Sequence, residues 1–125
     1  MKFGISFTTK FLNQGNALVN VYKDGTVQVS TGGTEMGQGL NTKIRQLVAD
    51  EFGISYDAVR IMITSTEKNN NTPPTAASAG TDLNGMAALK ACRKIRKNLT
   101  EFASSYLLSP DSDLEPSPKH IIFEN

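Results

Sequence analysis

Two short segments rich in glycine or alanine carry the residues best suited to ligand chemistry. The first, residues 32–39, reads Gly-Gly-Thr-Glu-Met-Gly-Gln-Gly and stands between a predicted strand and a predicted helix. Glycine lets a backbone turn sharply and approach a ligand closely. The free N–H groups of a first helical turn suit a phosphate or another anion. The spacing alone favours neither an anion-binding loop nor a plain glycine-rich turn. The segment also fails as a P-loop, because Gln38 and Gly39 stand where Lys and Ser or Thr are needed.

The second segment, residues 73–82, leads into another predicted helix. Its alanines and its glycine leave the backbone bare, whereas Ser78 and Thr81 can cap the helix N-terminus. Capping alone accounts for most of this composition. The pairing of two such segments, each entering a helix, indicates that together they could hold an elongated anionic cofactor through backbone N–H groups.

A β-hairpin must position the first segment. Residues 17–22 and 26–30 read as strands around Lys23-Asp24-Gly25. A two-residue loop would scatter the valines over both faces of the hairpin. A three-residue loop with left-handed Gly25 pairs Val21 with Val27 and Val19 with Val29, and so gives one apolar face. We favour the three-residue loop.

Helical spacing of apolar residues predicts two helices, at about 40–52 and 78–105. Gly53 stands where the first helix should have its C-cap, and Gly85 inside the second indicates close packing. Residues 5–8, 59–64 and 120–125 read as further strands, and 107–118 as a linker-like stretch. We therefore expect an α+β fold, with a mixed or antiparallel sheet of about four or five strands covered by the two helices. The apolar face of the second helix comprises Ala88, Ala91, Cys92, Ile95, Leu99, Phe102 and Tyr106.

Composition excludes several classes of protein. Thirteen Lys and Arg against twelve Asp and Glu give a net charge of +1, too small for nucleic-acid binding by bulk charge. One cysteine and one histidine argue against a disulfide and against a His/Cys metal cage. No apolar run reaches the length of a membrane span and no secretory leader is visible, so we expect a cytoplasmic protein.

Several residues that invite a chemical role have a simpler interpretation. We expect Glu35 to accept hydrogen bonds within its loop rather than act as a general base, Cys92 to be a buried structural thiol, and His120 to lie at the surface or a strand edge. The basic residues of the long helix should form a solvated face or contact a neighbouring domain; they are Lys90, Arg93, Lys94, Arg96 and Lys97. Four phenylalanines are expected in the core: Phe3, Phe7, Phe11 and Phe102.

Residues 32–43, Gly-Gly-Thr-Glu-Met-Gly-Gln-Gly-Leu-Asn-Thr-Lys, together with Thr75-Ala76-Ala77-Ser78, resemble the molybdenum-cofactor-binding region of the xanthine dehydrogenase/aldehyde oxidase family. The likeness runs from about Lys2 to Phe102 and is greatest to xanthine dehydrogenases. It implies that residues 1–125 are a single fragment of the molybdopterin-binding domain of a larger enzyme. That enzyme would hydroxylate purines or aldehydes with oxygen from water.

The resemblance also implies where the cofactor lies. Gly37, Gln38 and Gly39 would meet the pterin or phosphate portion, and Thr75, Ala76, Ala77 and Ser78 would lie along the pterin near the metal. In this family the pterin dithiolene holds the molybdenum, so no protein metal ligand is expected. The cofactor is molybdopterin, with its cytosine dinucleotide form left open. Iron–sulfur clusters and FAD belong to other domains or subunits, which would be partners together with the remainder of the molybdenum-binding chain.

This sequence departs from the family pattern in ways that matter. Gly80 stands where many relatives have serine. The family's catalytic glutamate, its substrate-orienting Arg and Glu, and the Gln that faces the metal have no counterpart here. The chain therefore carries no catalytic residue and is expected to be inactive alone. Two other readings remain open: a stand-alone nucleotide- or phosphate-binding module, and a structural or interaction domain without cofactor.

Overall fold

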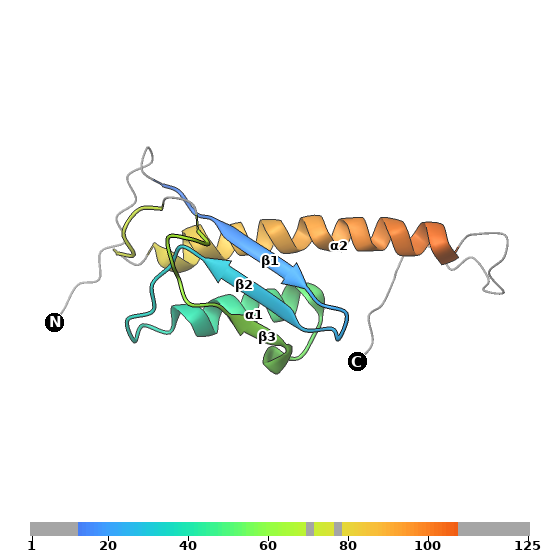
Figure 1. The fold of residues 1–125 in the computed structure, drawn as a ribbon, viewed down its shortest axis with the longest axis horizontal. Helices are drawn as coiled ribbons and strands as arrows, with labels where there is room; N and C mark the ends of the chain where they lie inside the picture. Colours follow the sequence, from blue (N-terminus) through green and yellow to red (C-terminus); the bar gives the residue numbers. More distant parts are fainter. Residues whose placement is uncertain (1–12, 70–71, 77–78, 108–125) are drawn as a thin grey trace.

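A small mixed sheet covered by two helices forms the folded part of the chain (Figure 1). The computed structural model describes residues 13–69, 72–76 and 79–107. The elements in order are β1 (Ala17–Val21), β2 (Val27–Thr31), α1 (Leu40–Phe52), the 3-10 turn η2 (Tyr56–Ala58), β3 (Val59–Ile61), the π-helical turn η3 (Thr81–Gly85) and α2 (Met86–Leu107). The α+β class is confirmed.

The sheet has the order β1-β2-β3, with β1 antiparallel and β3 parallel to β2. It therefore has three strands within the described residues, fewer than the four or five expected, and β3 ends at Ile61 rather than at residue 64. The strands predicted at 5–8 and 120–125 lie outside the described residues. Leu107 still belongs to α2, whereas residues 108–118 of the linker-like stretch also lie outside the described residues.

The predicted hairpin register is confirmed. Val21 pairs with Val27 and Val19 with Val29. Tyr22 N–H donates to the Thr26 carbonyl at 2.9 Å, which leaves a three-residue loop, and Gly25 has a φ of 81°. Because side chains alternate along a strand, this register sends the valines to the face that the helices cover.

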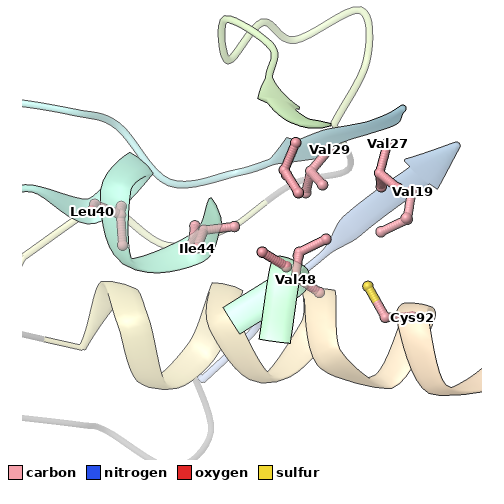
Figure 2. Packing of buried hydrophobic residues seen from close by; sticks show 10 residues of the cluster. Val19, Val27, Val29, Leu40, Ile44, Val48 and Cys92 are labelled. Atoms are coloured by element: carbon pink, nitrogen blue, oxygen red, sulfur yellow. The ribbon is translucent and has the colours of Figure 1, made fainter. Parts of the chain in front are cut away.

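The core lies between that face and the helices (Figure 2). Ile44 and Val48 of α1 point toward Val27 and Val29. Cys92 of α2 packs in the same cluster, next to Val19. Cys92 is fully buried, as predicted, and burial raises the pKa of its thiol to about 11. A thiol with so high a pKa is protonated at neutral pH, so Cys92 has a packing role.

Gly53 ends α1, and Gly85 of η3 admits a close approach to α1, as predicted. Gly53 is left-handed, with a φ of 67°, and its N–H bonds the last turn of α1. A Cβ placed on Gly85 would lie 2.9 Å from Leu47 Cδ1. The two helices are also joined by an ion pair, because Arg93 Nε donates to Glu51 Oε2 at 3.0 Å. The basic residues of α2 are otherwise exposed, as expected of a solvated face.

The expectation that Phe102 is a core residue is wrong. Its side chain is 69% exposed, like that of Tyr106 on which it stacks, and Leu99 is 41% exposed. The reason is length: twenty-two helical residues extend about 33 Å, whereas a five-residue strand covers about 17 Å. The end of α2 therefore passes beyond the sheet (Figure 1). Phe3, Phe7, Phe11 and His120 lie outside the described residues.

Candidate functional site

The segment between β2 and α1, residues 32–39, forms a tight loop that we call the first corner. The Glu35 carboxylate lies at its centre. Glu35 Oε1 accepts hydrogen bonds from the N–H groups of Gly37 and Gly39 at 2.9 and 3.0 Å, and Oε2 accepts from Asn41 N–H at 2.9 Å. Two amides at the N-terminus of α1, those of the N-cap Gly39 and of Asn41, are thus already bound to an internal anion.

The hydrogen bonds to Glu35 determine its chemistry. The N–H group of Asn41, followed by those of the glycines, lowers the pKa of the Glu35 carboxyl, because each bond favours the charged form. A carboxylate that is so stabilised is a weak proton acceptor. Glu35 therefore organises the loop, as the sequence analysis expected, and is unsuited to general-base catalysis.

The Gln38 side chain also stabilises the first corner, through two hydrogen bonds to its backbone. Its Oε1 accepts a hydrogen bond from Met36 N–H at 2.6 Å, and its Nε2 donates to the Thr34 carbonyl at 2.8 Å. Gly37 and Gly39 have φ values of 93° and 76°, where side chains other than hydrogen are strained. The conformation of the loop therefore depends on the two glycines as well as on Gln38 and Glu35.

The second corner consists of the described residues that precede and begin η3, 72–76 and 79–82. It is bonded directly to the first, because Thr34 N–H donates to Thr75 Oγ1 at 2.9 Å. The hydroxyl of Thr64, which follows β3, donates to the Gly33 carbonyl at 2.6 Å and to the Thr31 carbonyl at 3.1 Å. Segments far apart in the sequence are thereby held side by side.

Between the two corners lies a cleft of about 300 Å³. This volume is at the lower end of the range typical of small-molecule sites. Small side chains, hydroxyls, an amide and one ammonium group line the cleft. The lining residues are Met36, Gln38, Leu40, Lys43, Thr75, Ala76, Gly80 and Thr81.

Three of the residues predicted to contact a cofactor, Gln38, Thr75 and Ala76, meet in this cleft. Gly37 and Gly39, which flank Gln38 in the chain, have their N–H groups bonded to Glu35. Ala77 and Ser78 lie outside the described residues. The structure thus places both corners on one cleft.

Sequence reasoning missed Lys43 and misjudged Thr81. The helical period could have identified Lys43, because a residue one turn after Gly39 lies on the same side of the helix. Lys43 donates its N–H to the Gly39 carbonyl at 3.1 Å. Thr81 lies inside η3 and lines the cleft, while the N-cap position of η3 is held by Gly80, which has no side chain to cap with. Capping by Thr81 therefore does not account for the second corner.

A second hollow adjoins the cleft. It measures about 730 Å³ and runs along α1 toward η2, and Lys43 and Thr81 line both cavities. Its other lining residues include Gln46, Leu47, Asp50 and Tyr56. An elongated ligand could therefore extend from the cleft past Lys43 without crossing the protein interior.

Comparison with known proteins assigns this arrangement to a family. The family model described as the molybdopterin cofactor-binding domain matches residues 1–124. The chain belongs to the molybdopterin cofactor-binding domain family. Its relatives include the xanthine dehydrogenase of Dictyostelium discoideum, 61% identical over 94 residues, and that of Oryza sativa, 56% identical over 103 residues. These alignments cover 75% and 82% of this chain but only 7% and 8% of the relatives.

A solved structure shows the same fold for this molybdopterin cofactor-binding domain. The Cu,Mo-CO dehydrogenase superposes with a TM-score of 0.72 at 29% identity, over 82% of this chain and 13% of that one. The chain spans less than a tenth of the length of the two xanthine dehydrogenases named above. Within the described residues, no three His, Cys, Asp or Glu side chains gather as a metal site. None of the described helices is long and apolar enough to cross a membrane.

Proposed function

We propose that this chain binds molybdopterin in the cleft between its two corners, as one part of a xanthine dehydrogenase-like molybdenum hydroxylase. The observation that carries the proposal is that Gln38 of one corner and Thr75 and Ala76 of the other line one cavity. The side chains of these residues suit a pterin, which is a fused ring system with amide-like donors and acceptors at its edge. Ala76 and Gly80 leave room for the ring, and Gln38, Thr75 and Thr81 offer hydrogen bonds.

Each corner has a distinct task in this proposal. When the pterin binds, the Gln38 carboxamide exchanges its hydrogen bonds to Met36 N–H and the Thr34 carbonyl for hydrogen bonds to the pterin edge. The Thr34–Thr75 bond fixes the width of the cleft, and Glu35 keeps the first corner rigid by occupying its amides. We extend the proposal to Gly37, Gly39, Ala77 and Ser78 as further cofactor contacts, as the family resemblance implies. When bound, the cofactor supplies the molybdenum chemistry that transfers oxygen from water to a substrate carbon.

The remaining parts of the enzyme belong to the proposal too. We expect purines or aldehydes as substrates, iron–sulfur and FAD domains or subunits as electron acceptors, and the cytoplasm as the compartment. The remainder of the molybdenum-binding chain would supply the catalytic residues, so this chain alone should be inactive. The proposal covers both simple molybdopterin and its cytosine dinucleotide, and its support is that the cleft and the larger hollow share Lys43 and Thr81 as lining residues.

Glu35 argues against the alternative of a stand-alone phosphate-binding module. Such a module would use the free amides at the N-terminus of α1. Three backbone N–H groups there, those of Gly37, Gly39 and Asn41, are instead bonded to the Glu35 carboxylate. A phosphate would have to displace that carboxylate before it could bind these three N–H groups.

A direct titration tests the proposed function. The probe is the oxidised, fluorescent derivative of molybdopterin, added to the purified 125-residue chain. At about −0.3 kcal/mol per non-hydrogen atom, a ligand of roughly 20 such atoms gains about −6 kcal/mol, a Kd of tens of micromolar. We expect saturable binding in that range and no displacement by a tenfold excess of ATP or GTP. Absence of binding, or displacement of the pterin by either nucleotide, would contradict the proposal.

A further inference from the structure

The cleft between the corners has one charged side chain among its described lining residues, and that side chain is Lys43. The other lining residues are neutral. Lys43 is exposed, and no ion pair or side-chain hydrogen bond holds its ammonium among the described residues. An unpaired cation at the edge of an otherwise neutral cleft favours a ligand with an anionic group at that edge.

The backbone cannot easily serve the same anion. The amides of Gly37 and Gly39, just before α1, and of Asn41 in its first turn are bonded to Glu35. The pKa of the Glu35 carboxyl is lowered, so Glu35 is an anion itself and repels a second one. A phosphate that enters this cleft therefore meets a helix N-terminus whose positive end is already neutralised by Glu35, and a side-chain cation is its stronger partner.

Lys43 also stands where the two cavities join. It lines both the 300 Å³ cleft and the 730 Å³ hollow, as does Thr81. The acidic residue of the larger hollow, Asp50, stands two helical turns further along α1, toward the end of α1 near Gly53. A negative group is thus favoured at the Lys43 end of the hollow and disfavoured at the Asp50 end.

We propose that Lys43 binds the phosphate of the pterin cofactor and so sets the direction in which the cofactor lies. The ring occupies the smaller cleft against Gln38 and Ala76, and the phosphate lies at the junction beside Lys43 and Thr81. Any nucleotide attached to that phosphate extends into the larger hollow. This inference rests on the proposed function and adds to it the residue that recognises the anionic end of the ligand.

Paired ligands test the role of Lys43 apart from pterin binding itself. The probes are the fluorescent oxidised derivative of molybdopterin with its phosphate and the same compound after phosphatase treatment. We expect the unaltered chain to bind the phosphorylated form about tenfold more tightly, as one charge-assisted hydrogen bond can provide. Lys43→Gln should remove this preference and leave the affinity for the dephosphorylated form unchanged, whereas Lys43→Arg should keep it.

A matched control and the possible outcomes make the test decisive. Lys23→Gln, in the hairpin loop away from the cleft, should retain the full preference. Equal binding of both probes by the unaltered chain, or a preference that survives Lys43→Gln, would overturn the role of Lys43 and leave the proposed function standing. Failure of the unaltered chain to bind either probe would overturn both.

Discussion

Replacing Gly33 with alanine should destabilise the domain by about 1–3 kcal/mol, the usual cost of overpacking a buried site. A Cβ on Gly33 would lie 2.5 Å from Leu40 Cδ2 and 3.2 Å from Asn84 Nδ2. Leu40 is only 2% exposed and Asn84 only 6%, so neither can move into solvent. Thermal unfolding followed by circular dichroism should show a fall in Tm of roughly 5–15 °C.

Gly80 provides the matched control, because it contacts the same leucine. A Cβ there would lie 3.3 Å from Leu40 Cδ2, which a small shift accommodates, and the φ of −59° suits any residue. Gly80→Ala should therefore lower Tm by much less than Gly33→Ala. Equal Tm values for the two variants would contradict the packing of the first corner against Leu40.

Replacing Gln38 with alanine should weaken pterin binding about 10- to 30-fold. The change removes the only carboxamide that lines the cleft among the described residues, and with it the hydrogen bonds that this group is proposed to make to the pterin. Two such hydrogen bonds of about 1 kcal/mol each account for an effect of that size. Titration with the fluorescent pterin derivative measures it.

The stability of the Gln38 variant separates binding from folding. Gln38→Ala removes two hydrogen bonds within an exposed loop, so it should lower the free energy of unfolding by about 1–2 kcal/mol, less than the total stability of a typical domain. Gln14→Ala, an exposed glutamine before β1, should change neither the stability nor the pterin affinity. Unchanged binding by Gln38→Ala would show that the first corner does not contact the cofactor.

Sequence patterns predicted the hairpin and α1, because interactions between residues close in sequence determine these two elements. The spacing of the valines around Gly25 determined the hairpin register, because only one loop length puts them on one face. The helical period and Gly53 likewise determined α1. In both cases the signal and the interaction that it reports lie within one or two elements.

Other features depend on contacts that the sequence does not display. The apolar period of α2 continues to Tyr106 although the sheet ends earlier, so periodicity could not separate buried Cys92 from exposed Phe102. In the first corner, sequence analysis named Glu35 and the helix amides separately. Only the folded loop brings the carboxylate onto the amides of Gly37, Gly39 and Asn41, and for this reason we assign anion recognition to Lys43 rather than to these amides.

The central claim is that both corners face one ligand, and amide NMR with a ¹⁵N-labelled chain tests it most directly. On titration with the fluorescent pterin derivative, the amide signals of Gln38 in the first corner and of Ala76 and Thr81 in the second should shift with one common Kd. Those of the hairpin loop, residues 23–25, should stay in place. Shifts confined to one corner, or two corners that saturate at different concentrations, would contradict a shared site.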